Sequence, residues 1–129
     1  MPQATIVAKC FPTEDPEKVR RAILNIFPGS QPEHSAEEVR AITQDLSRFK
    51  ELIRNHRILD STRRVLLRGS DGQRTEFALN KQAAHAGKVS FLEEKVALGG
   101  LQVRIEDEDL EALIDQVAPV TVNGEEVPT

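Results

Sequence analysis

Two kinds of hydrophobic periodicity alternate along this chain, and their order restricts the folds it can adopt. Apolar residues recur at every second position within residues 4–10, 73–79 and 101–105, which is typical of strands with one buried face. Residues 16–27, 45–57, 59–68 and 109–117 carry apolar residues at spacings of three and four, which is typical of amphipathic helices. Residues 38–43 could form a short strand or begin a helix, and their alternation favours the strand. Residues 89–91 are expected to add another short strand.

This order of elements predicts an α+β fold with a single compact domain. We expect a mixed or antiparallel sheet of about four to five strands, with the helices packed mainly on one face. The domain should span residues 1–118, followed by a C-terminal tail over residues 119–129 that is rich in turn-forming and acidic residues. Residues 28–37 have the composition of a loop, and residues 81–86 are expected to form one helical turn.

Capping residues indicate where the helices begin. Asp15 followed by Pro16 combines an N-cap acid with proline at the first helical position. Asp45 is expected to cap the next long helix, and either Asp107 or Asp109 the last one.

Length and composition restrict the class of protein. The chain has 129 residues, which fits one domain, and it has no apolar run near the roughly 20 residues that a membrane span needs. No secretory leader is visible, and the single cysteine, Cys10, fits a reducing compartment. We therefore expect a cytoplasmic protein with no membrane partner.

The chemistry that most enzymes need has no signature in the sequence. The histidines His34, His56 and His85 stand alone, with no second ligand at metal-binding spacing, and no glycine-rich phosphate loop or nucleophile elbow is present. Cys10 is expected to be a buried, inert thiol and His56 a packed core histidine. These features predict no catalytic residues, no cofactor and no metal, so the chain is not expected to be an enzyme.

Charge is spread unevenly. Residues 48–88 hold ten basic and four acidic residues, a balance of +6, whereas the whole chain carries −4 and the remainder therefore −10. Arginine outnumbers lysine in this stretch by seven to three, and a guanidinium binds phosphate with two parallel hydrogen bonds. Such a block is the footprint expected where one face meets a polyanion, and the same block could instead be ordinary solvated surface.

The leading hypothesis is a non-enzymatic RNA-binding module that contacts the phosphate backbone of structured RNA through an arginine and lysine face. Five phenylalanines are the only aromatic residues and several fall at core positions, so base stacking is not the expected mode of recognition. Asp60 precedes Arg63 and Arg64 at helical spacing and could neutralise either one. The candidate RNA-binding residues are Arg54, Arg57, Arg63, Arg64, Arg68, Asn80, Lys81, Gln82 and Lys88.

Two alternatives remain open. The first is a structural or protein-interaction domain, such as a homodimer in which the basic face meets the acidic residues 106–126 of a second copy. The second is a small-molecule enzyme, which rests only on the polar string Asn80-Lys81-Gln82.

Three strings resemble one known family when taken together. They are residues 12–19 (PTEDPEKV), residues 57–69 (RILDSTRRVLLRG) and residues 79–84 (LNKQAA) followed by residues 87–91 (GKVSF). In this order they are similar to small archaeal proteins of unknown function related to predicted RNA-binding and exosome-associated proteins, over roughly residues 4–118. The resemblance implies an α+β domain like the fifth protein of the large ribosomal subunit, an RNA-binding role and a cytoplasmic location. It implies no catalytic residues.

Overall fold

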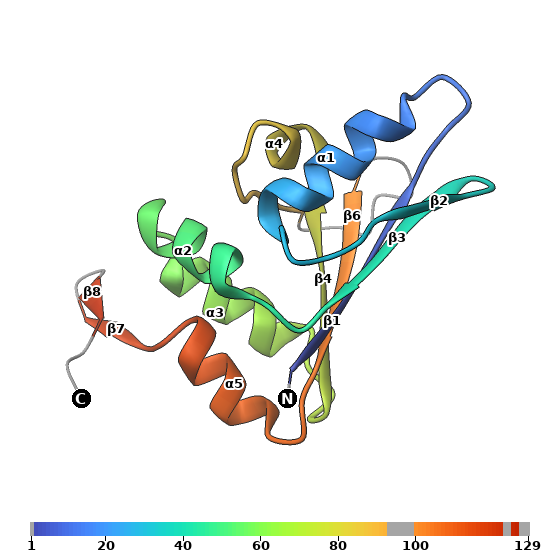
Figure 1. Ribbon diagram of the computed structural model, residues 1–129. Helices are drawn as coiled ribbons and strands as arrows, with labels where there is room; N and C mark the ends of the chain where they lie inside the picture. Colours follow the sequence, from blue (N-terminus) through green and yellow to red (C-terminus); the bar gives the residue numbers. More distant parts are fainter. Residues whose placement is uncertain (1, 93–99, 123–124, 127–129) are drawn as a thin grey trace.

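The chain folds around a main antiparallel sheet with a layer of helices on one side (Figure 1). The computed structural model describes residues 2–92, 100–122 and 125–126. In chain order the elements are β1 (Gln3–Lys9), α1 (Pro16–Ile26), β2 (Glu33–Ser35), β3 (Glu38–Thr43), α2 (Ser47–Asn55), α3 (Leu59–Arg68), β4 (Arg74–Asn80), α4 (Lys81–His85), β5 (Phe91–Leu92), β6 (Gly100–Glu106), α5 (Leu110–Val117), β7 (Thr121–Val122) and β8 (Glu125–Glu126).

The main sheet has six strands in the order β2-β3-β1-β6-β4-β5, and every neighbouring pair is antiparallel. The central strand β1 places Ile6 opposite Ala41 of β3 and opposite Val103 of β6. Because side chains alternate between faces, this register puts one apolar row of each strand on the same side. The buried face therefore runs continuously across β3, β1, β6 and β4.

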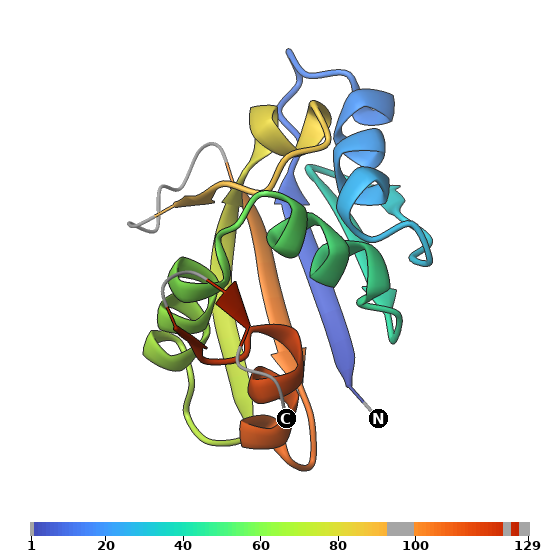
Figure 2. The same cartoon turned by 90° about the vertical axis from the view of Figure 1, so that its left-hand side faces the viewer.

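All of the helices lie against that face, which Figure 2 shows with the helices in front of the strands. Asp15 accepts a hydrogen bond from the Glu17 backbone N–H at 3.0 Å and begins α1, with Pro16 in the first turn as expected. Asp45 accepts from the Ser47 backbone N–H at 2.9 Å at the start of α2, and Asp109 accepts from the Ala112 backbone N–H at 3.2 Å in α5. No helix in the described part of the chain has the length and apolar character that crossing a membrane requires.

A row of aromatic rings joins the helical layer to the sheet. Phe27 stacks on Phe49 with ring centroids 5.6 Å apart, and Phe49 stacks on Phe77 at 5.8 Å. Phe91 then meets Phe77 edge-on at 5.7 Å. These contacts link the end of α1, helix α2, strand β4 and strand β5, so the core depends on pairs of residues that are distant in sequence.

The fold class and the placement of helices on one face are confirmed. The sheet has one strand more than expected, because β2 lies inside residues 28–37, which the composition assigned to a loop. Part of the expected tail also forms a small hairpin, with β7 pairing antiparallel to β8. The prediction for His56 is wrong: α2 ends at Asn55, the chain turns away there, and His56 is exposed.

Candidate nucleic-acid interface

The turn between α2 and α3 holds Arg57 in a backbone conformation that is unusual for a side-chain-bearing residue. Its φ is 55°, in the left-handed region that favours glycine. The Arg57 N–H donates to the Arg54 carbonyl at 3.1 Å, and the Ile58 N–H donates to the Ile53 carbonyl at 3.0 Å. This is the Schellman arrangement that ends many helices, and its left-handed position is usually occupied by glycine. Arg57 itself is exposed.

The outer face of α3 presents Arg64 and Arg68 to solvent. Neither side chain has an acidic partner within the described residues. Asp60, which sequence spacing placed within reach of Arg64, instead accepts a hydrogen bond from the Thr121 hydroxyl. We use the name α3 arginines for three exposed residues: Arg57, in the turn just before α3, and Arg64 and Arg68 on its outer face. These three side chains are available to a ligand.

Two other predicted arginines hold the end of α5. Arg54 donates to the carbonyls of Gln116 at 3.1 Å and Val117 at 3.4 Å, and Arg63 donates to the Ala118 carbonyl at 3.2 Å. Arg63 also pairs with Asp115 at 2.7 Å. Cations at a helix C-terminus satisfy its free carbonyls and complement its dipole, so both residues have a structural task.

The remaining predicted residues surround α4. The Asn80 side chain caps this helix by accepting from the Ala83 N–H at 2.8 Å. Lys81 is almost enclosed, with its side chain 13% exposed; it pairs with Glu14 at 3.0 Å and donates to the Lys9 carbonyl at 2.8 Å. Gln82 and Lys88 are exposed.

The two groups of predicted residues lie at different ends of the helical layer. Helix α4 packs beside α1, whereas α3 packs beside α5 and β4, and Figures 1 and 2 both show this separation. The site residues predicted from the sequence thus lie on two distinct surfaces. The α3 arginines are all exposed, whereas Asn80 and Lys81 at the other surface are partly buried.

Cys10 lies next to the α4 group, and its burial is confirmed. Desolvation raises the pKa of its thiol, and the nearby Glu14 carboxylate raises it further, while Lys81 acts in the opposite direction. A thiol with a raised pKa is a poor nucleophile at neutral pH. Among the described residues, no group of three or more histidine, cysteine, aspartate or glutamate side chains could hold a metal ion.

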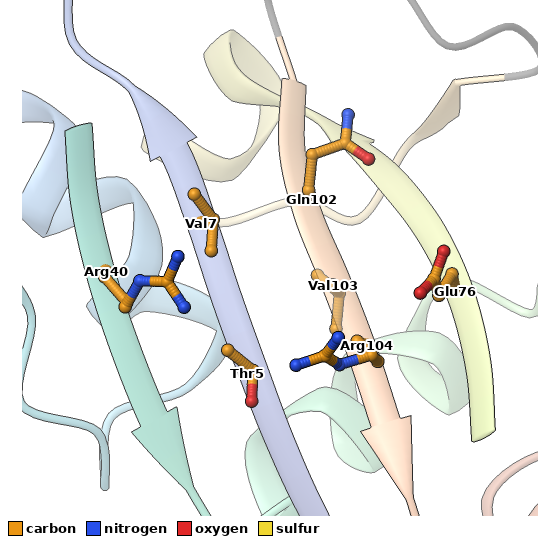
Figure 3. A pocket seen from close by; sticks show the side chains of 7 residues that line it. All are labelled: Thr5, Val7, Arg40, Glu76, Gln102, Val103 and Arg104. Atoms are coloured by element: carbon orange, nitrogen blue, oxygen red, sulfur yellow. The ribbon is translucent and has the colours of Figure 1, made fainter. Parts of the chain in front are cut away.

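The open face of the sheet carries a cluster that the sequence analysis missed. A depression of about 200 Å³ lies over β1 and is lined by Thr5, Val7, Arg40, Glu76, Gln102, Val103 and Arg104 (Figure 3). Arg40 and Arg104 lie outside the basic stretch of residues 48–88, and 64 positions separate them in the sequence. The alternation of apolar and polar residues along β3 and β6 predicts that Arg40 and Arg104 face solvent. Only the pairing of both strands with β1 brings the two arginines to the same depression.

Each arginine of the depression is held by an acid on its own strand. The Arg40 Nε lies 3.6 Å from Glu38, and the Arg104 Nε lies 3.0 Å from Glu106. The Arg104 Nε is buried, and the Glu106 contact lacks hydrogen-bond alignment, so this donor has no hydrogen-bond acceptor among the described residues. Figure 3 shows both guanidinium groups pointing toward β1 from opposite sides.

Comparisons with known proteins agree with this fold. The UPF0201 protein of Methanocaldococcus jannaschii is 40% identical over 130 residues, covering 95% of this chain and 75% of that protein. The UPF0201 protein of Metallosphaera sedula is 36% identical over 132 residues, covering 96% of this chain and 92% of that protein. A UPF0200/UPF0201 protein of Archaeoglobus fulgidus is 38% identical, and the chain spans only 39% of its length.

Solved structures give the same result. The crystal structure of the UPF0201 protein from Methanococcus jannaschii matches with a TM-score of 0.87 and 40% identity, over 98% of this chain and 99% of that one. A DUF54 protein from Archaeoglobus fulgidus shares the fold at a TM-score of 0.66 and 21% identity, over 90% of this chain and 96% of that one. The family described as RNA binding matches residues 3–108. The chain therefore belongs to this RNA-binding family, together with the UPF0201 proteins of archaea.

Proposed function

We propose that this protein binds structured RNA without catalysing a reaction, and that the α3 arginines contact its phosphate backbone. Gln82 and Lys88 at the other end of the helical layer would extend the contact along a longer RNA. The proposal includes the cytoplasmic location expected from the sequence.

The observation that carries this proposal is the contrast between neighbouring arginines. Arg54 and Arg63 are engaged with the end of α5, whereas Arg64 and Arg68 extend from α3 with no acidic partner among the described residues. Exposed, unpaired guanidinium groups on one helix are well suited to phosphate oxygens, because each can donate two parallel hydrogen bonds. The family description adds support for RNA as the polyanion.

The backbone at Arg57 supports the same conclusion. A residue with a side chain in the left-handed region costs roughly 1 kcal/mol or more relative to glycine. The Arg57 side chain is exposed and forms no hydrogen bond or ion pair among the described residues that would offset this cost. An exposed arginine at a glycine position is therefore better explained by ligand contact than by stability.

The buried aromatics favour phosphate and shape recognition over base stacking. Phe27 and Phe49 are fully buried, and Phe77 is 7% exposed. Phe11 is half-buried beneath the Lys81 ammonium, 5.8 Å from its ring centroid. Because single-strand binding by stacking needs exposed rings, an RNA with double-stranded or otherwise structured regions fits this surface better.

The test is binding of a fluorescently labelled RNA hairpin, measured by anisotropy at low salt. We expect Arg64→Ala with Arg68→Ala to weaken binding by about tenfold or more, because two charge-assisted contacts are lost. The matched control is Lys18→Ala with Arg21→Ala, which removes two exposed cations from α1 and should bind nearly as the wild type does. Equal affinity in the α3 double variant and the wild type would refute the proposal, and a dimer that dissociates with salt would support the protein-interaction alternative.

A further inference from the structure

The open face of the sheet has a second arrangement of arginines that none of the preceding functions uses. Strands β3 and β6 flank β1, with Arg40 opposite Val7 and Arg104 opposite Thr5. Their backbones therefore start roughly 12 Å apart, two strand spacings across the sheet and two residues along it. Their guanidinium groups both point inward toward β1, and Thr5, 8% exposed, lies between them. A phosphate group fits such a gap, because each guanidinium group can donate to one of the two non-bridging oxygens of a phosphodiester.

The acids beside these arginines orient them. Glu38 and Glu106 lie two positions away from these arginines on the same strands, and their carboxylates contact the Nε atoms. The terminal nitrogens of both guanidinium groups are then left to face the depression.

The charge of the depression selects the kind of phosphate. Glu76 lines it from β4, directly opposite Arg104 in the strand register. Glu76 is the third carboxylate near the two guanidinium groups, after Glu38 and Glu106. Its negative charge repels a doubly charged ligand more strongly than a singly charged one. A phosphodiester carries one negative charge, whereas a phosphate monoester carries nearly two at neutral pH, so the diester is favoured.

We propose that the depression between Arg40 and Arg104 binds one phosphodiester group of an RNA strand, on the side of the molecule opposite the α3 arginines. This proposal extends the proposed RNA-binding function to a second, independent surface. Thr5 and Gln102 would add a hydroxyl and an amide to the guanidinium contacts.

The test uses NMR titration of the full chain, following the arginine Nε–H signals, with three probes. The dinucleotide uridylyl-(3′→5′)-uridine supplies one phosphodiester, uridine monophosphate supplies a monoester, and inorganic phosphate supplies the free ion. We expect the dinucleotide to shift the Arg104 Nε–H signal and to bind more tightly than the other two. Arg40→Gln and Arg104→Gln should each weaken dinucleotide binding by about tenfold, while Arg20→Gln on α1 serves as the matched control.

Glu76→Gln makes the test independent of folding defects. Removal of this carboxylate should strengthen binding of uridine monophosphate several-fold, because the repelled second charge is then tolerated. A damaged fold could not produce that gain. Unchanged binding in all three depression variants would overturn the proposal. If these variants changed the sedimentation of the chain and not its ligand binding, the proposal would fall and the open face would be an interface between copies.

The two RNA surfaces can fail separately. If the α3 double variant abolishes hairpin binding while the dinucleotide leaves Arg104 unshifted, the α3 proposal stands and this one falls. If the dinucleotide shifts Arg104 but the α3 double variant binds the hairpin like the wild type, the reverse holds.

Discussion

The Arg63 guanidinium lies 2.7 Å from the Asp115 carboxylate and thereby joins α3 to α5 across the helical layer. The Arg63 side chain is 25% exposed and that of Asp115 is 64% exposed. The same guanidinium donates to the Ala118 carbonyl just past α5. This pair divides the arginines of α3 into one that stabilises the fold and two that remain open to a ligand.

Arg63→Ala should therefore reduce stability and leave RNA binding nearly intact. Loss of one partly exposed ion pair and one hydrogen bond is expected to lower the free energy of unfolding by about 1 kcal/mol. Urea denaturation followed by circular dichroism measures this, and a hairpin titration measures the affinity. A loss of affinity in Arg63→Ala as large as in Arg64→Ala would contradict the division.

Arg57→Gly should have the opposite effect: higher stability and weaker RNA binding. Glycine relieves the left-handed backbone at φ 55°, so the free energy of unfolding should rise by up to about 1 kcal/mol. RNA affinity should fall at the same time, because the side chain is lost. Arg57→Ala, which loses the side chain without relieving the backbone, is the control: it should bind as weakly and gain no stability.

Phe49→Ala should nearly abolish stable folding. Phe49 is fully buried and touches both Phe27 and Phe77, so its truncation leaves a cavity where the helices meet the sheet. The expected loss is about 3–5 kcal/mol, a large share of the roughly 5–15 kcal/mol that stabilises a domain. The chain has no tryptophan or tyrosine, so far-UV circular dichroism is the suitable probe. A loss below 1 kcal/mol, the level expected for the control Phe11→Ala near the surface, would refute the role of this aromatic row.

Cys10 should make stability fall at alkaline pH. Burial raises the pKa of the folded thiol above that of a free cysteine, so the unfolded chain ionises first as the pH rises. The contribution of the neutral thiol to the free energy of unfolding is present in full below the unfolded pKa of about 8.5. It is lost as the pH rises towards the pKa of the folded thiol. Urea denaturation of the wild type and of Cys10→Ala from pH 7 to pH 10 isolates the effect. Two curves that stay parallel across this range would contradict it.

Local signals in the sequence predicted most of the helices. The structure confirms Asp15 as the N-cap of α1, followed by Pro16. It also confirms the buried faces expected for the later helices, with Thr62 and Leu66 in α3 and Leu110, Leu113 and Val117 in α5. These features depend on neighbours within one or two helical turns, so periodicity and capping chemistry suffice to find them.

The features that the sequence did not reveal depend on pairing or on chain direction. Glu33, His34 and Ser35 are all exposed, so β2 has no alternation to indicate a strand, and only its pairing with β3 defines it. The sequence spacing places His56 on the apolar face of α2. In the structure α2 ends at Asn55, just before the left-handed turn at Arg57, so His56 lies outside the helix.

The candidate site shows the same limit. The basic stretch located the α3 arginines, because they are close in sequence. The meeting of Arg40 with Arg104 follows only from the register of three strands, which no local pattern specifies.

The salt dependence of RNA binding tests the central claim most directly. Each phosphate contact contributes roughly 0.7–0.9 to the slope of log affinity against log salt concentration. The wild type should show a steep slope, and Arg64→Ala with Arg68→Ala should make it shallower by roughly 1.4–1.8, whereas Lys18→Ala with Arg21→Ala should leave it unchanged. The same slope in the wild type and the α3 double variant would contradict the account.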